Sequence, residues 1–242
     1  MPEIIIIGGT DSSGGAGLTR DTAAAHSIGC EVLPVVTAVT VQTNGALIAT
    51  ELMPEEVVRL QIKAAFDSGE PCSVKIGMLG SASIASVVVE ALADHQLPVV
   101  IDPVFKSSSN GCLMRGSLPD QLLQRATIIT PNLPEAATLS NLPQAATPLE
   151  IRRQAEAILA LGPQAVLVKD GHGDAPIVSD RLFQASGHDV FCHKRLSFGR
   201  RGTGCHLATA IACHLTMQRD LTNACELAIA QVHKWLRKVQ EN

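Results

Sequence analysis

Residues 201–212 read RGTGCHLATAIA, and this stretch decides how the rest of the chain is interpreted. Two glycines flank Thr203, and small and apolar residues then follow at helical spacing, which predicts a tight turn leading into a buried helix. Free backbone N–H groups and the positive end of the helix dipole favour an anion at such a turn. Gly202, Thr203 and Gly204 are therefore predicted to form an anion hole.

Cys205 follows this turn directly, in the first turn of the predicted helix. A helix N-terminus lowers the pKa of a thiol, so we expect a partly ionised sulfur beside the anion hole. The simpler alternative is a structural glycine turn followed by a small buried cysteine, because free cysteine is often buried. Taken alone, the stretch leaves both interpretations open.

The composition favours one soluble α/β domain over residues 1–242. Of the 242 residues, 46% are hydrophobic but only 2% are aromatic, so the core must consist mainly of Ile, Val, Leu and Ala. Such a core suits helices packed on a mostly parallel sheet.

The same composition argues against several classes of partner. A net charge of −4 and the scarcity of aromatic residues give no footprint for nucleic acid. No apolar run has the length of a membrane span. Seven cysteines without a Cys-x-x-Cys pair indicate neither a disulfide framework nor a zinc site, and they fit a reducing cytoplasm.

Residues 4–7 read IIII and predict a buried first strand, followed by the glycine-rich loop GGTDSSGGAG at residues 8–17 and a helix to about Ile28. The loop has the spacing of neither a dinucleotide fingerprint nor a P-loop. We expect it to let a small ligand approach the backbone. Asp21, one helical turn further on, is either a polar contact for that ligand or a solvated carboxylate.

Polar residues also stand where predicted strands end. Gln42 offers both a donor and an acceptor, so it could pair with an amide-like edge or an aminopyrimidine edge. Asp102 follows an apolar strand at the sheet edge where open α/β folds bind ligands, so it either serves a metal or merely begins a turn. Lys169 ends another strand and could reach a phosphate.

Asn132 and Glu135 are three residues apart at the start of a predicted helix, so they face the same side. They could hold Mg²⁺ and its waters. They could equally be an N-cap and a capping-box glutamate.

Taken together and in order, these motifs resemble the hydroxymethylpyrimidine/phosphomethylpyrimidine kinases of thiamin biosynthesis, within the ribokinase-like superfamily. The matching segments are GTDSSGGAG (9–17), KIGML (75–79), DPV (102–104), TPNLPEA (130–136), VK (168–169) and GTGC (202–205). The resemblance implies a three-layer αβα sandwich with a mostly parallel central sheet, which phosphorylates a pyrimidine hydroxymethyl group with ATP and Mg²⁺. It also suggests a homodimer.

The resemblance implies a role for each matching residue. Cys205 stands at the position of the catalytic cysteine, behind the anion hole. The remaining roles are ATP contacts at Asn132, Lys169 and Thr203, metal ligands at Asp102 and Glu135, and pyrimidine contacts at Gly9, Asp21, Gln42, Met78 and Val104.

Two residues depart from the family pattern. Asp170 replaces the usual glycine after the lysine, which predicts a negative charge close to the phosphate site. Arg201 replaces the usual histidine and is expected to offset that charge or to contact phosphate. Two other functions stay open: a pyridoxal or related vitamin kinase, and a pyrimidine-binding pseudokinase, for which Asp170 and the short C-terminal end would be the signs.

Overall fold

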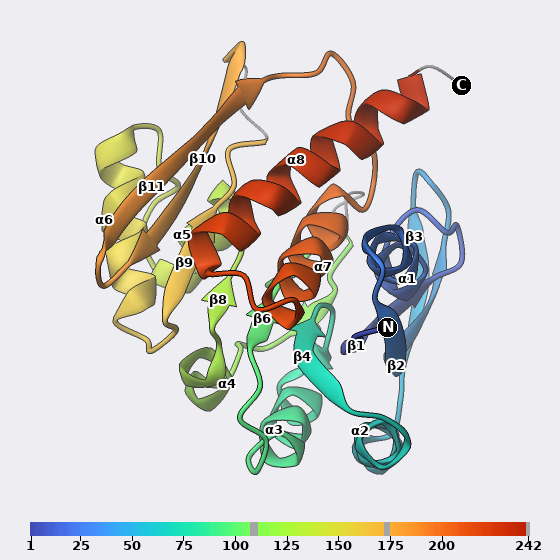
Figure 1. The fold of residues 1–242 in the computed structure, drawn as a ribbon. Coiled ribbons are helices and arrows are strands. Elements are labelled where there is room, and N and C mark those ends of the chain that lie inside the picture. Colours follow the sequence, from blue (N-terminus) through green and yellow to red (C-terminus); the bar gives the residue numbers. More distant parts are fainter. Residues whose placement is uncertain (107–110, 172–174, 241–242) are drawn as a thin grey trace.

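The computed structural model describes residues 1–106, 111–171 and 175–240 (Figure 1). Within these residues a nine-stranded sheet has the order β11-β10-β9-β8-β6-β4-β1-β2-β3. Its strands are β1 Glu3–Asp11, β2 Glu31–Gln42, β3 Leu47–Leu52, β4 Pro71–Ile76, β6 Val99–Ile101, β8 Ile128–Ile129, β9 Ala165–Val168, β10 Ile177–Gln184 and β11 Gly187–Lys194. A separate pair, β5 Gly80–Ser81 and β7 Met114–Arg115, lies outside this sheet.

The middle of the sheet is parallel and its edges are antiparallel. Strands β2, β1, β4, β6, β8 and β9 pair in parallel, whereas β3 pairs antiparallel with β2. The hairpin of β10 and β11 extends the other edge. The edge strand β3 was not predicted from the sequence.

Helices cover both faces of the sheet, and this confirms the predicted three-layer αβα sandwich (Figure 1). On one face lie α1 Gly17–Ile28, α7 Thr203–Thr216 and α8 Leu221–Gln240. On the other lie α2 Glu55–Ser68, α3 Ala82–Ala91, α4 Asp120–Arg125, α5 Leu133–Ser140 and α6 Pro148–Leu159.

The four isoleucines of β1 show why an uninterrupted apolar run predicts this architecture. Ile5 and Ile7 belong to the hydrophobic cluster on one face of the sheet, and Ile4 and Ile6 belong to the cluster on the other. Successive side chains of a strand point to opposite faces, so a central parallel strand must be apolar at every position. All four are fully buried.

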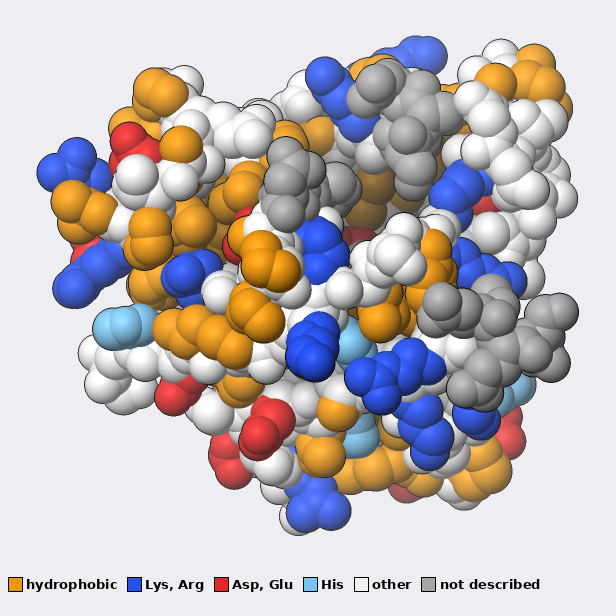
Figure 2. Space-filling model, turned by 90° about the horizontal axis from the view of Figure 1, so that it is seen from above, with side chains coloured by type: hydrophobic (Ala, Val, Ile, Leu, Met, Phe, Trp, Pro, Cys, Tyr) orange, Lys and Arg blue, Asp and Glu red, His pale blue; other side chains and the backbone are white. Residues whose placement is uncertain are grey.

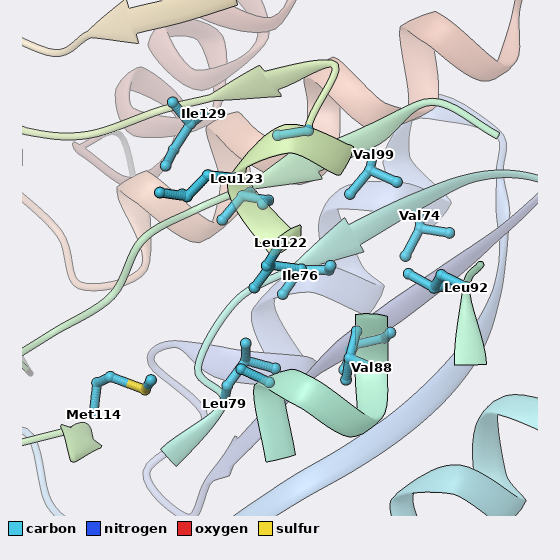
Figure 3. Close-up of a cluster of buried hydrophobic side chains, with 14 of the residues drawn as sticks. Val74, Ile76, Leu79, Val88, Leu92, Val99, Met114, Leu122, Leu123 and Ile129 are labelled. Carbon is cyan, nitrogen blue, oxygen red and sulfur yellow. The ribbon is translucent and has the colours of Figure 1, made fainter. Parts of the chain in front are cut away.

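Figure 3 shows part of the first cluster, in which Val74 and Ile76 of β4 and Val99 of β6 lie near Val88 of α3 and Leu122 of α4. This core is aliphatic, as the scarcity of aromatic residues required. It fixes the strands whose ends carry the polar residues described below. In the described part of the chain, no helix combines the length and the hydrophobicity needed to cross a membrane.

Candidate active site

A cavity of about 750 Å³ lies where the parallel strands end, on the side of the molecule that Figure 2 shows. Loops after β1, β6 and β9 reach it, together with the start of α7. It is lined by every residue to which a role was assigned from the sequence: Gly9, Asp21, Gln42, Met78, Asp102, Val104, Asn132, Glu135, Lys169, Gly202, Thr203, Gly204 and Cys205. The fold therefore brings these residues to one cavity, although their individual roles stay predictions.

The turn before α7 is built tightly enough to require its glycines. Gly202 is the N-cap of α7 and has a φ of 79°, a left-handed conformation that suits glycine. A Cβ at this position would also collide with the backbone oxygen of Gly15. At Gly204 a Cβ would lie 3.2 Å from Lys169 Nζ. The first turn of α7 therefore lies against the glycine-rich loop and beside the lysine.

The sulfur of Cys205 lies near the start of α1 as well as that of α7, because the backbone N–H of Gly17, the first residue of α1, is close enough to lower its pKa. The expectation of a lowered thiol pKa is nevertheless wrong. Burial raises the pKa of Cys205 to about 12, and the negative charges of Asp21 and Asp102 act in the same direction. Lys75 and the Gly17 N–H oppose this shift without overcoming it. Cys205 is therefore a neutral thiol at neutral pH.

Asp21 is fully buried, so the solvated-carboxylate interpretation is wrong. Its Oδ2 lies 2.7 Å from the Lys75 ammonium, and its Oδ1 accepts a hydrogen bond of 2.9 Å from the Thr209 hydroxyl. Burial is the largest single influence and disfavours the Lys75 ammonium, but the nearby negative groups, with Asp21 the strongest of them, together outweigh burial and raise the pKa of Lys75. Sequence reasoning gave Lys75 no role, although a lysine inside an otherwise apolar strand was a signal that it is paired.

Lys169 lies beside both predicted metal ligands, Asp102 and Glu135. Its Nζ donates to Asp102 at 3.0 Å and lies 3.9 Å from Glu135 Oε2. Burial raises the pKa of Glu135 to about 7; Lys169 opposes this shift and the charge of Asp102 adds to it. The three side chains therefore form one buried charge cluster on the cavity wall.

Asn132 and Glu135 form a capping box at the start of α5, so the structural alternative predicted for them is present. The Asn132 side-chain oxygen accepts from the Glu135 N–H at 2.8 Å, and Glu135 Oε2 accepts from the Asn132 N–H at 2.8 Å. Asn132 also forms a parallel backbone bridge with Lys169. The capping box thus fixes a carboxylate beside the lysine.

The donor set suits Mg²⁺. The described residues contain no cluster of three or more His, Cys, Asp or Glu side chains able to hold a metal. Mg²⁺, however, is commonly held by one or two carboxylates together with phosphate oxygens and water. Asp102 and Glu135 supply two hard oxygen ligands that face the same lysine, which is compatible with an ion that arrives with a nucleotide.

The residues predicted to contact a pyrimidine lie on β1, α1 and β2 and on the loops after β4 and β6. Gln42 ends β2, and its Oε1 accepts a hydrogen bond of 3.3 Å from the Thr40 hydroxyl. A Cβ at Gly9 would lie only 2.8 Å from the sulfur of Met78, so a glycine allows this methionine to lie against β1. Val104 lines the same cavity.

The expectation that Arg201 offsets the charge of Asp170 is wrong, whereas its contact with phosphate stays a prediction. Its guanidinium pairs with Asp11 at 3.0 Å and not with Asp170. The backbone N–H of Asp170 donates to the Asp180 carboxylate, and Asp170 itself does not line the cavity. Asp11 and Asp180 do line it, and sequence reasoning assigned neither a role. The residue that suggested lost catalysis therefore lies outside the cavity wall.

Comparison with known proteins agrees with this picture. A family model described as phosphomethylpyrimidine kinase matches residues 11–241. A Streptomyces coelicolor protein named hydroxymethylpyrimidine/phosphomethylpyrimidine kinase is 36% identical over 234 residues, which cover 94% of this chain and 86% of the relative. The Escherichia coli protein of the same name is 36% identical over 214 residues, which cover 86% of this chain and 80% of the relative.

Solved structures give the same fold. A phosphomethylpyrimidine kinase from Clostridium difficile superposes with a TM-score of 0.84 at 32% identity, covering 98% of this chain and 100% of that one. A Bacillus subtilis pyridoxal kinase in an ADP complex superposes with a TM-score of 0.85 at 26% identity, covering 95% of this chain and 89% of that one. The family match and these relatives show that the chain belongs to the phosphomethylpyrimidine kinase family, a group of phosphotransferases with the ribokinase-like fold.

Proposed function

We propose that this chain transfers a phosphoryl group from MgATP to the hydroxymethyl oxygen of 4-amino-5-hydroxymethyl-2-methylpyrimidine, and that it also accepts the monophosphate of that pyrimidine. One observation carries the proposal. Cys205, the glycine turn before it, Gln42 and Lys169 all line a single cavity. A side chain suited to an aminopyrimidine and a lysine suited to phosphate therefore share one space with the thiol.

Gln42 is the pyrimidine-recognising residue in this proposal. Its amide can donate to one atom of the aminopyrimidine edge and accept from the next. The side chain is largely buried, so an unmatched ligand would leave it without partners, at a cost that supports specificity. Met78 and Val104 supply apolar contact with the ring, and Gly9 makes room for Met78.

Lys169 and the turn before α7 neutralise the negative charge of the phosphates. ATP supplies the phosphoryl group, and Mg²⁺ held by Asp102 and Glu135 supplies additional positive charge when both are bound. The backbone N–H groups of Gly204 and its neighbours lie at a helix N-terminus, where an anion is favoured without any rearrangement. Thr203 and Asn132, the other two residues predicted to contact ATP, line the same cavity.

Cys205 orients the substrate hydroxymethyl group as a neutral thiol. Its raised pKa leaves almost no thiolate at neutral pH. Phosphoryl transfer depends mainly on positioning and charge stabilisation, so a neutral sulfur that hydrogen-bonds the attacking hydroxyl is sufficient to orient it. As the new O–P bond forms and the bond to ADP breaks, the hydroxyl proton passes to an oxygen of the transferred phosphoryl group. The start of α7 carries the sulfur, and the Gly17 N–H lies close to it.

A pyridoxal kinase activity is the second candidate. The observation in its favour is the close superposition on the Bacillus subtilis pyridoxal kinase. Pyridoxal also carries a hydroxymethyl group on a flat heteroaromatic ring, but it lacks the amino group that Gln42 would match.

The cellular setting is part of the proposal. All seven cysteines are free, including the exposed Cys72, Cys112 and Cys192, which fits the cytoplasm. The homodimer suggested by the family resemblance is tested by light scattering of the purified chain.

A turnover assay over a small panel tests the function. The purified chain is incubated with MgATP and, separately, with hydroxymethylpyrimidine, its monophosphate and pyridoxal, and each product is identified by mass. We expect phosphate to be added to both pyrimidines, with pyridoxal turned over more slowly. ATP-dependent product from pyridoxal alone would establish the second candidate, and tight pyrimidine binding without any product would establish a pseudokinase.

A further inference from the structure

Arg201 connects three segments that are far apart in the sequence. Its Nη2 lies 3.0 Å from Asp11 Oδ2, while its Nη1 donates to the Ser13 hydroxyl at 3.0 Å and to the backbone oxygen of Thr43 at 2.8 Å. Asp11 and Ser13 belong to the glycine-rich loop, and Thr43 follows β2. The Asp11 side chain is 3% exposed and that of Arg201 is 15% exposed, so water screens the pair only weakly.

Asp11 organises the glycine-rich loop around this ion pair. Its Oδ1 accepts from both the backbone N–H and the hydroxyl of Ser13, at 2.9 and 2.8 Å. Its Oδ2 accepts from the backbone N–H of Ala16 at 2.9 Å and also meets Arg201. The carboxylate therefore fixes the backbone just before Gly17, whose N–H lies close to the Cys205 sulfur.

The same loop is fastened to Gln42. The Ser12 hydroxyl donates to the Gln42 carbonyl at 2.8 Å and accepts from the Gln42 N–H at 2.8 Å. Gly202, immediately after Arg201, has no space for a side chain because Gly15 lies against it. The ion pair of Asp11 and Arg201 thus connects the loop that holds Gln42, the residue proposed to recognise the pyrimidine, with the turn proposed to bind phosphate.

We propose that Arg201 is a positioning residue that, through Asp11, holds the glycine-rich loop and Gln42 in register with the anion hole of α7. The inference rests on the proposed function. Asp11 neutralises the charge of Arg201, and the Ser13 hydroxyl and the Thr43 carbonyl hold the same guanidinium in place, so its task is to align the two halves of the cavity.

The geometry explains why an arginine serves this task. A guanidinium is planar and presents several donors in a fixed arrangement, so it can meet a carboxylate, a hydroxyl and a carbonyl together. Lysine keeps the positive charge on a single nitrogen and cannot reproduce this fork. Arg201→Lys therefore separates the contribution of charge from that of geometry.

The experiment compares Arg201→Ala, Arg201→Lys, Asp11→Asn and the double variant Asp11→Asn/Arg201→Ala. The matched control is Arg59→Ala, which removes another arginine–carboxylate pair, the 2.9 Å pair with Glu90, from the far surface. For each protein we measure kcat, the KM of the pyrimidine and of ATP, and the midpoint of thermal unfolding. Wild-type enzyme is assayed first; if it phosphorylates neither pyrimidine, the proposed function fails and the variants are not interpreted.

With an active wild type, Arg201→Ala is expected to lower kcat/KM for the pyrimidine by about 10²-fold, because misplacing reacting groups by an ångström costs this much. Both kcat and the pyrimidine KM should worsen in the folded protein, Arg201→Lys should recover only a small part, and the double variant should be no worse than Arg201→Ala. The control should match wild type. Unchanged kinetics of folded Arg201→Ala, or full recovery of kcat/KM by Arg201→Lys, would overturn the inference. So would a double variant whose loss of kcat/KM equals the product of the losses in Asp11→Asn and Arg201→Ala.

Discussion

The Lys75 ammonium lies 2.7 Å from the Asp21 carboxylate, and each of the two side chains is only 1% exposed. Lys75 is on β4 and Asp21 is on α1, so the pair joins the sheet to the helix beneath the cavity. The Thr209 hydroxyl adds α7 to the same network. A buried ion pair of this kind contributes little net stability, but removing one partner leaves the other charge buried and unpaired.

Lys75→Met should therefore lower the free energy of unfolding by about 3–5 kcal/mol. Urea unfolding followed by circular dichroism measures this change. The double variant Lys75→Met/Asp21→Leu should regain much of the loss, because no unpaired charge remains. Lys63→Ala, which breaks an exposed pair with Asp67, is the control and should barely change stability. A double variant less stable than Lys75→Met would contradict the explanation.

Cys205 should react slowly with iodoacetamide, because a thiol whose pKa is about 12 holds very little thiolate. At about pH 8 we expect Cys205 to be alkylated at least about 10²-fold more slowly than the exposed Cys72, and its rate should keep rising as the pH increases. Peptide mass spectrometry at timed intervals measures both rates, with urea-unfolded protein as the reference for equal access. Alkylation of Cys205 as fast as that of Cys72 would show an activated thiolate instead.

Gly204→Ala should impair phosphate binding more than folding. The added methyl group would lie 3.2 Å from Lys169 Nζ and 3.5 Å from Asp102 Oδ2, which crowds that pair without striking backbone. We expect the KM of ATP to rise by about tenfold, while the unfolding midpoint stays close to that of wild type. Gly202→Ala is the contrasting variant: its positive φ and its collision with Gly15 should cost about 1–3 kcal/mol of stability. An unchanged ATP KM in Gly204→Ala would place the phosphates elsewhere.

Asp180 makes the free energy of unfolding depend on pH. Burial raises the pKa of Asp180 to about 6, and the hydrogen bond that its carboxylate accepts from the Asp170 N–H opposes this rise only in part. A carboxyl group whose pKa is raised on folding stabilises the fold while protonated, and this benefit is lost as the pH rises through the folded value.

Asp180→Asn keeps an acceptor for the Asp170 N–H and removes the buried charge, so it should stabilise the protein above about pH 6. The gain over wild type should grow by roughly 1–1.5 kcal/mol between about pH 5 and about pH 8 in urea unfolding. A stability gain of Asp180→Asn that shrinks as the pH rises would contradict a raised pKa of Asp180 in the folded protein.

The sequence was sufficient for the fold because the pattern was repetitive. Apolar runs ending in polar residues recur along the chain, and a run such as residues 4–7 can be buried on both faces only in the centre of a sheet. The edge strand β3 was missed because it lacks that pattern: Ile48 and its neighbours are largely exposed.

For the site, the sequence located the cavity residues but not their electrostatics. Strand ends and the glycine turn were readable because residues at these places converge on one edge of the sheet. The pKa of Cys205 was not readable, since it depends on burial and on Asp21 and Asp102, which are distant in sequence. The pairing of Arg201 with Asp11, 190 residues away, was hidden for the same reason.

The central claim is that the Cys205 thiol presents the substrate hydroxyl to a phosphoryl group held at the start of α7. Its most direct test is the kcat of Cys205→Ala with hydroxymethylpyrimidine and MgATP, measured beside pyrimidine affinity by calorimetry. We predict a kcat lowered by about 10²-fold, the cost of misplacing a reacting group, with pyrimidine affinity retained. A kcat close to that of wild type would contradict the account, because the sulfur would then have no part in the transfer.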